Sequence, residues 1–235
     1  MENLFVIKIG GSTFSTSEDK LFDFEQANKL KDTFTKLIDR GNKFVLVTGG
    51  GYAARKYQKM VRDAGLSEYD EHYVGTATNN INAILLRGVF GDLAEEKIFA
   101  FSDFDKTEPI SFNKSVLLAG GGHPGPSGDW DACYLAKYTG ANQVISLKDI
   151  DAVYSADPDV DKNATKVPTL TWDQYLDIIG NPEKHKPGGN FPVDPLASKF
   201  SKENGITFKV LSGKDLNNFE KSILGESFEG STISI

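Results

Sequence analysis

Short apolar runs rich in β-branched and aromatic residues alternate along the chain with stretches in which apolar residues recur at helical spacing. The first kind of run is typical of a buried strand, and the second of a helix with one face on a core. The strands that we predict are 4–9, 43–47, 97–101, 115–118, 143–146 and 207–210. The helices that we predict are 24–39, 52–64, 71–89, 129–138, 172–180 and 195–204. Such an alternation predicts an α/β protein: a three-layer α/β/α sandwich with a mainly parallel central sheet.

Two segments interrupt the alternation. Residues 12–21 are rich in Ser and Thr, which predicts a surface loop after the first strand, and residues 181–190 contain Pro and Gly typical of an exposed turn or hairpin. Asp194 precedes the last predicted helix and has the chemistry of an N-cap. Because no repeat or linker divides the chain, we expect residues 1–235 to form one domain, with halves specialised for two ligands.

Composition narrows the class of protein. Hydrophobic residues make up 39% and charged residues 25% of the 235, which excludes wholesale disorder. The longest apolar runs, such as 115–119, are far shorter than the roughly 20 residues of a membrane span. The start of the chain lacks the pattern of a secretory leader, and a single cysteine, Cys133, fits a reducing compartment. We therefore expect a cytoplasmic protein in which Cys133 is a core residue.

The net charge of −7 does not favour nucleic acid as a partner, so an anionic ligand needs locally placed cations. Three glycine clusters follow predicted strands: 10–11, 49–51 and 120–122. Ligands bind at the carboxyl ends of strands in an open α/β sheet, and glycine lets backbone N–H groups approach anionic oxygens. Each cluster could be only a tight turn, or the three together could form a polyphosphate site. None matches a Walker or dinucleotide fingerprint, so a phosphate cradle here has to be built differently.

Three charged residues adjoin these clusters. Lys8 lies in the first strand, where burying it without an anionic partner would be costly; the alternative is a solvated edge-strand lysine. Arg55 lies early in the helix after the second cluster, so its guanidinium and the free N–H groups of that helix could converge on one anion; the alternative is a surface ion pair. Asp129 begins another helix, and its capping chemistry does not exclude a functional role.

Six segments match one family in its own order: 6–12, 47–57, 124–129, 151–158, 193–199 and 230–233. Through them the sequence resembles the amino acid kinase superfamily, and within it the archaeal-type uridylate (UMP) kinases. The resemblance implies the amino acid kinase-like fold, with 1–125 mainly binding the acceptor and 126–235 mainly binding the nucleotide.

The implied activity is ATP- and Mg²⁺-dependent phosphoryl transfer to a small phosphorylated acceptor, with UMP to UDP as the first expectation. Two alternatives stay open: a kinase of the same fold with another phosphate or a carboxylate as acceptor, and a non-catalytic nucleotide- or oxyanion-binding protein similar to the molybdenum-storage branch. The implied partners are small-molecule nucleotides and further copies of the chain, in a hexamer or dimer, with no nucleic acid and no membrane.

The resemblance also implies roles for individual residues, while metal ligands stay unassigned. Lys8, Gly10 and Gly11 would stabilise the transferring phosphoryl group, Asp129 would orient the catalytic lysines, and Lys199 would be a second lysine against the triphosphate. The residues implied for acceptor binding are Gly49, Gly50, Gly51, Arg55, His72, Gly122 and Ser127. Those implied for nucleotide binding are Lys148, Asp149, Asp151, Tyr154, Asp157 and Pro158.

The chain departs from the family at several of these positions. His72 stands where uridylate kinases have a nucleoside-reading aspartate, and Asn80 stands where an arginine is common. The loop 122–129 lacks both threonine hydroxyls of the family. On the donor side, Asp149 replaces an asparagine and adds negative charge, while Ala152 replaces a glycine and disfavours a left-handed backbone. We therefore expect acceptor recognition and donor affinity to differ from the family pattern.

Four aromatic or imidazole positions complete the predictions. His72 and His123 belong to segments that the resemblance brings to one cleft, where a hydrogen-bonding or packing role is favoured over metal ligation. Trp130 and Trp172, at the starts of two predicted helices, are expected to be packing residues.

Overall fold

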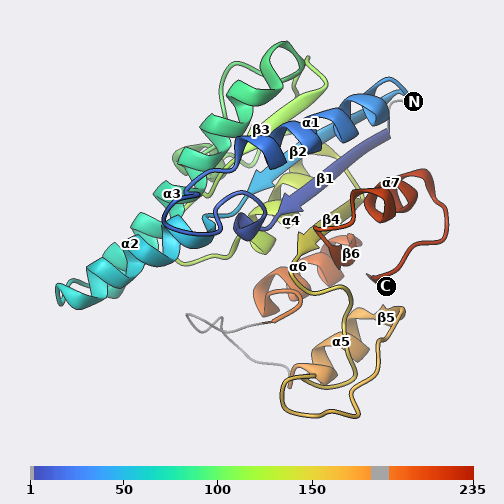
Figure 1. Ribbon diagram of the computed structural model, residues 1–235. Coiled ribbons are helices and arrows are strands. Elements are labelled where there is room, and N and C mark those ends of the chain that lie inside the picture. The colour runs from blue at the N-terminus through green and yellow to red at the C-terminus, as the bar shows by residue number, and fades with distance from the viewer. Residues whose placement is uncertain (1–2, 181–190) are drawn as a thin grey trace.

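The computed structural model describes residues 3–180 and 191–235, and these build a single central sheet between two layers of helices (Figure 1). The strands are β1 (Asn3–Ile9), β2 (Asn42–Thr48), β3 (Val116–Ala119), β4 (Gln143–Lys148), β5 (Thr169–Thr171), β6 (Thr207–Ser212) and β7 (Ser231–Ser234). Their order in the sheet is β3-β2-β1-β4-β6-β7-β5. All neighbouring strands pair in parallel except β6 and β7, which are antiparallel. The carboxyl ends of β1, β2, β3 and β4 therefore meet at one edge of the sheet.

Two apolar clusters lie on opposite faces of this sheet. The helices are α1 (Phe24–Ile38), α2 (Gly51–Asp63), α3 (Glu68–Phe90), α4 (Gly128–Thr139), α5 (Trp172–Ile178), α6 (Pro195–Asn204) and α7 (Leu216–Leu224). In β1, Val6 packs into the cluster formed with α4, α5 and α6, whereas Ile7 packs into the cluster formed with α1, α3 and α7. This is the alternation expected of a strand buried on both faces, and it confirms the three-layer architecture.

The helices α2 and α3 form an arm. They pack along each other, and Figure 1 shows α2 and the adjoining end of α3 projecting away from the sheet. Ser67 and Asp70 form a capping box at the start of α3, which fixes the turn between the two helices.

One predicted strand is wrong. Residues 97–101 have a single bridge to the sheet, Phe99 with Ala119, and the chain then enters the 3₁₀ turn η3 (Phe101–Asp105). Just before this segment, Ala94 forms another isolated bridge with Val116. Between the two bridges this segment is two residues longer than β3, so it bulges away from a continuous ladder. The carboxylate of Glu95 holds the bulge by accepting the N–H groups of Asn113 and Lys114 at 2.6 and 2.9 Å.

The sequence analysis missed three elements. β5 and β7 have three and four residues, too few for a periodic signal, but α7 carries a visible one in the N-cap Asp215 and the buried Phe219 and Ile223. The other five strands and all six helices occur within a few residues of their predicted bounds.

The structure also tests several predictions for single residues. Cys133 and Trp172 are buried, Trp130 packs against the core, and the carboxylate of Asp194 caps α6, all as expected. The loop 12–21 is exposed only in its second part, because it opens with the 3₁₀ turn η1 (Gly11–Thr13) and the buried Phe14.

The expected turn at 181–190 lies outside the described residues. Across 3–180 and 191–235, no helix is both long and apolar enough to cross a membrane.

Candidate functional site

The first two glycine clusters pack backbone against backbone at the sheet edge. The N–H of Gly10 donates to the carbonyl of Leu147 at 2.9 Å, and that of Gly49 donates to the carbonyl of Ile9 at 3.0 Å. A Cβ atom at Gly11 would lie 2.0 Å from the nitrogen of Gly51, and one at Gly51 would lie 2.4 Å from the oxygen of Gly11. Gly51 also has a φ of +63°, which disfavours any side chain. The two turns therefore form one interlocked unit that only glycine permits.

The glycines of the third cluster, 120–122, leave room for α3 to cross the carboxyl end of β3. A Cβ at Gly120 would lie 1.9 Å from Oδ1 of Asn80, and one at Gly122 would lie 2.7 Å from the ring of Phe104. Asn80 is buried, and its Oδ1 accepts the N–H of Gly121 at 2.9 Å. Asn80 is thus a short side chain that binds the turn directly.

A pocket of about 600 Å³ opens at the carboxyl ends of β1 and β4. Its lining includes these residues predicted from the sequence: Lys8, Gly10, Gly11, Gly51, Arg55, Lys148, Asp149, Tyr154, Asp157 and Pro158. The apolar side chains of Ile150, Ile178, Ile179 and Phe191 also line it, and the sequence analysis missed them. Nothing marks these four in sequence, because the fold brings them together from the turn after β4, the end of α5 and the segment before α6.

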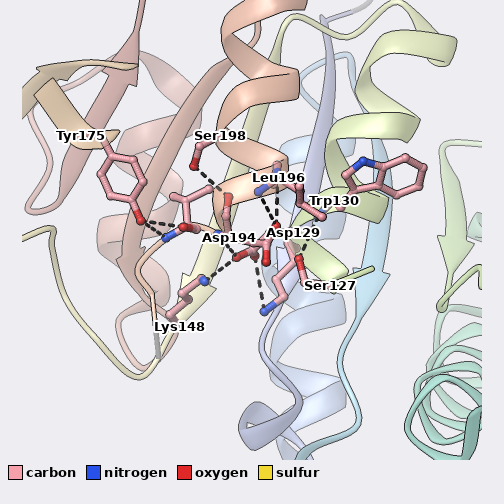
Figure 2. A network of polar contacts seen from close by, with 11 residues as sticks. Ser127, Asp129, Trp130, Lys148, Tyr175, Asp194, Leu196 and Ser198 are labelled. Atoms are coloured by element: carbon pink, nitrogen blue, oxygen red, sulfur yellow. Dashed lines mark hydrogen bonds and ion pairs between the residues drawn. The ribbon is translucent and has the colours of Figure 1, made fainter. Parts of the chain in front are cut away.

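Two lysines share one buried carboxylate behind this pocket. Asp129 lies in the first turn of α4, with Oδ2 at 2.8 Å from Nζ of Lys148 and Oδ1 at 3.7 Å from Nζ of Lys8 (Figure 2). The N–H of Asp194 also donates to Oδ2 at 3.2 Å. The stem of Lys8 passes Gly128, where an added Cβ would lie 3.5 Å from its Cε. The role that the resemblance implied for Asp129 is geometrically available, with Lys148 as one of the two oriented lysines.

Burial of this cluster and the charges within it shift the pKa values of Lys8 and Asp129. Burial lowers the pKa of Lys8, although the attraction of Asp129 opposes that shift. Burial alone would raise the pKa of Asp129, but the charges of Lys148 and Lys8 outweigh it and hold that pKa below its ordinary value. Two lysines therefore flank one carboxylate at the wall of the pocket, where their ammonium groups could meet an anion with several oxygens.

A second layer of contacts fixes Asp129 in place (Figure 2). The hydroxyl of Tyr175 donates to the carbonyl of Val193 and accepts its N–H, both at 2.6 Å. The next residue, Asp194, caps α6 by accepting the N–H groups of Leu196 and Ala197 at 2.9 and 3.1 Å. These contacts hold the backbone N–H that bonds Asp129. No sequence pattern identifies Tyr175 as part of this network, because its partner Val193 lies 18 residues away along the chain.

Asp131, two residues further along α4, is a buried carboxyl that the sequence analysis missed. Burial raises its pKa well above the ordinary value, the negative charge of Asp129 adds to that shift, and a hydrogen bond from the backbone of Gly122 opposes it. Asp131 thereby connects α4 with the third glycine turn.

The expectation for Arg55 needs a correction. Arg55 is exposed on the pocket rim and has no ion pair within the described residues. The N–H groups of Tyr52 and Ala53, in the first turn of α2, donate to the carbonyl and hydroxyl of Ser15 at 2.8 and 3.0 Å. These two groups are therefore not available to an anion, contrary to the expectation that free N–H groups of this helix converge with Arg55.

Both histidines are engaged by local carboxylates. Nε2 of His72 lies 3.6 Å from Glu68, one helical turn away, and Nε2 of His123 lies 2.6 Å from Asp105. Neither lines the pocket, and the structure gives them different partners rather than a shared cleft.

Other predicted residues lie beside the pocket rather than on its wall. Ser127 is the N-cap of α4, accepting the N–H of Trp130 at 3.3 Å. Asp151 binds Lys166 at 2.7 Å and the hydroxyl of Tyr154 at 3.0 Å, and the Lys166 contact lowers its pKa. Lys199 is half-buried on α6.

The remaining predicted positions are turn residues. Gly49, Gly50 and Gly122 belong to the turns described above and do not line the pocket. Ala152 is buried without backbone strain, since within the described residues Phe101 alone among non-glycine residues has a positive φ.

Comparison with known proteins finds similarity to one protein family along most of the chain. The model of the amino acid kinase family matches residues 3–212. The uridylate kinase of Methanocorpusculum labreanum is 32% identical over 97% of this chain and 94% of its own length. The uridylate kinase of Thermococcus onnurineus is 34% identical over 94% of this chain and 95% of its own.

Solved structures show the same likeness. The crystal structure of uridylate kinase from Archaeoglobus fulgidus superposes with a TM-score of 0.80 at 30% identity, covering 98% of this chain and 99% of the other. The UMP kinase of Bacillus anthracis has a TM-score of 0.77 at 18% identity, covering 99% and 96%, and supports the fold alone.

Proposed function

Because the chain belongs to the amino acid kinase family, we propose that it transfers the γ-phosphoryl group of ATP to UMP, forming ADP and UDP. The observation that carries the proposal is the buried Asp129 held between Lys8 and Lys148 at the wall of a glycine-lined pocket. Phosphoryl transfer asks mainly for placement of charge, and this cluster places two cations beside the interlocked turns. Its full-length relatives named uridylate kinase support UMP as the acceptor.

We assign the two substrates to the two halves of the chain. The segment 149–158 and the apolar Ile150, Ile178 and Phe191 offer the donor both polar and nonpolar surface, and they belong to residues 126–235. Gly49–Gly51 and Arg55 belong to residues 1–125 and would hold the phosphate of UMP. Lys8 lies between the halves, where donor and acceptor phosphates meet.

In the proposed reaction a phosphate oxygen of UMP attacks the γ-phosphorus of ATP. The bond between that phosphorus and the bridging oxygen breaks, and its electron pair leaves with ADP. Lys8 and Lys148 neutralise charge on the oxygens of the transferring group, and Asp129 keeps both ammonium groups oriented. The N–H of Gly10 is already bonded to Leu147, so the N–H of Gly11 is the one of that pair left for a phosphate.

Mg²⁺ fits this site as a companion of the triphosphate rather than as a resident ion. Within residues 3–180 and 191–235, no group of three or more His, Cys, Asp or Glu side chains could hold a metal alone. Mg²⁺ is commonly bound by one or two carboxylates together with substrate phosphates, and the pocket wall has exposed carboxylates at Asp149, Asp157 and Asp159. When bound, the ion would supply further positive charge against the phosphate oxygens.

We also propose that the protein is a homo-oligomer. The exposed side chains of Ile81 and Ile84 on α3 and of Met60 on α2 support this, because an apolar face on a projecting helix pair is typical of a surface that another chain covers. Whether it is a dimer or a hexamer, and its cytoplasmic location, stay predictions.

A coupled assay of ADP release with UMP, CMP, AMP, phosphorylated non-nucleotides and carboxylates tests the proposal. We expect turnover with UMP well above every other acceptor. Turnover with a different phosphate or with a carboxylate would replace UMP as the acceptor. ATP binding by calorimetry without ADP release for any acceptor would instead support the non-catalytic alternative.

A further inference from the structure

Three exposed aromatic rings are stacked beside the third glycine turn. Tyr69 and Tyr73 of α3 have ring centroids 6.1 Å apart and an interplanar angle of 21°, and Tyr73 and Phe101 are 6.0 Å apart at 28°. Their exposed fractions are 64, 45 and 37% from Tyr69 to Phe101. We call these three residues the aromatic ladder. Rings stacked in this way turn their inner faces toward one another, so a planar ligand can stack only on the outer face of a ring at an end of the ladder.

The backbone of Phe101 is held in an unfavourable conformation. Its φ of +49° is a left-handed value that Gly, Asn and Asp adopt far more readily than a bulky residue. The N–H of Phe101 donates to the carbonyl of Gly121 at 3.1 Å. The strain brings no burial of the ring, so the conformation needs another explanation, and such strain is concentrated at ligand sites.

The ladder is connected to the turn assigned to the acceptor phosphate. A Cβ at Gly121 would lie 3.3 Å from Nδ2 of Asn79, and a Cβ at Gly50 would lie 2.9 Å from Oδ1 of the same side chain. One asparagine therefore contacts both turns. Tyr73 and Asn79 are six positions apart on α3, which is roughly 9 Å along the helix and is comparable with the length of a nucleoside monophosphate.

We propose that Phe101, the end ring of the aromatic ladder whose backbone bonds the third glycine turn, is the stacking surface for the base of the acceptor nucleotide. This inference rests on the proposed function and adds to it a mode of base recognition. His72, which stands where relatives have the nucleoside-reading aspartate, is paired with Glu68, so stacking takes the place of that carboxylate contact. Stacking acts on the ring face that every base has, so the ladder adds affinity for the base without itself distinguishing uracil from cytosine.

The proposed test replaces Phe101 by Asn, which removes the ring and accepts a positive φ. KM for UMP should rise about tenfold or more, because stacking of a base on an aromatic ring contributes on that scale. We expect kcat and KM for ATP to stay within twofold of wild type. The matched control is Phe24→Asn, since Phe24 is another exposed ring, 53% exposed and 4.9 Å from Phe22, at the start of α1.

Calorimetry separates recognition of the base from recognition of the phosphate. Phe101→Asn should weaken binding of UMP and CMP and leave binding of ribose 5-phosphate unchanged. An unchanged UMP affinity in Phe101→Asn overturns the inference. An unchanged UMP affinity together with an altered oligomeric state in sedimentation also overturns it, and assigns the ladder to an interface between copies. If the wild-type protein binds UMP but releases no ADP, the proposed function fails while the binding comparison still decides the ladder.

Discussion

The donor and acceptor sides of this protein are built in different ways. On the donor side, the buried carboxylate of Asp129 is fixed by Lys148 and by the backbone N–H of Asp194. On the acceptor side, Arg55 is exposed on the rim and His72 is paired on its own helix. Because a buried charge without a partner is costly, the donor side is organised before any ligand binds, whereas the acceptor side has ligand contacts still to form. Substitutions should therefore affect stability on one side and affinity on the other.

The largest effect should come from Asp129→Asn, which leaves Lys8 and Lys148 buried without their carboxylate. Removing one partner of a buried ion pair costs about 3–5 kcal/mol, so the free energy of unfolding should fall by that amount and Tm by on the order of 10 °C. Chemical and thermal unfolding measure it. The control is Asp63→Asn, whose carboxylate pairs with Lys59 on the exposed surface of α2. If both variants lose equal stability, the donor side is not the organised one.

Lys8→Ala should lower kcat about a hundredfold or more, since one well-placed cation at a transferring phosphoryl group contributes about 3 kcal/mol. The free energy of unfolding should change little, because Lys148 still neutralises Asp129 at 2.8 Å. Steady-state ADP release and urea unfolding give the two values, with the exposed Lys29→Ala on α1 as control. Activity within threefold of wild type would remove Lys8 from the reaction.

Asp131→Asn should change how stability depends on pH. The pKa of Asp131 is raised in the folded protein, so the folded state binds the proton more tightly than the unfolded state does. Its contribution is favourable below the ordinary pKa of aspartate and is lost as the pH rises toward the raised value. The variant should therefore gain stability over wild type with rising pH, by at most about 1.4 kcal/mol per unit. Urea unfolding between pH 4.5 and 7 measures this, and parallel curves for the two proteins would contradict it.

The smallest effect concerns the acceptor side. Arg55→Ala should raise KM for UMP about tenfold and leave stability and KM for ATP unchanged, because its exposed guanidinium has only the ligand to bind. Initial rates at varied UMP and ATP measure both constants, and Lys59→Ala on the same helix is the control. A rise in KM for ATP instead would indicate that Arg55 binds the donor, which would contradict the contrast drawn between the donor and acceptor sides.

The features of the fold that depend on local sequence patterns were predicted correctly. The strand that carries Lys8, the helix that begins near Asp129 and the cap at Asp194 all follow from spacing and capping chemistry, and the three-layer fold follows from their order. The strand expected at 97–101 failed because a two-residue bulge depends on β3, not on its own residues.

The candidate site was predicted less completely, since its contacts join distant residues. The bond between Lys148 and Asp129 spans 19 positions, and the bond between Ser15 and Ala53 spans 38. Neither partner was visible from the other. Asp131 carries no motif, and its unusual pKa arises only from burial beside Asp129.

The contact between Gly11 and Gly51 limits how the enzyme can open. With a hypothetical Cβ only 2.0 Å from the opposing backbone nitrogen, the two turns have no free space between them and behave as a rigid seam. Substrates and products therefore cannot enter or leave through a gap between the turns that follow β1 and β2. Nucleotides therefore bind and dissociate from the solvent side of the pocket, which is bordered by the polar segment after β4 and by the projecting helix pair.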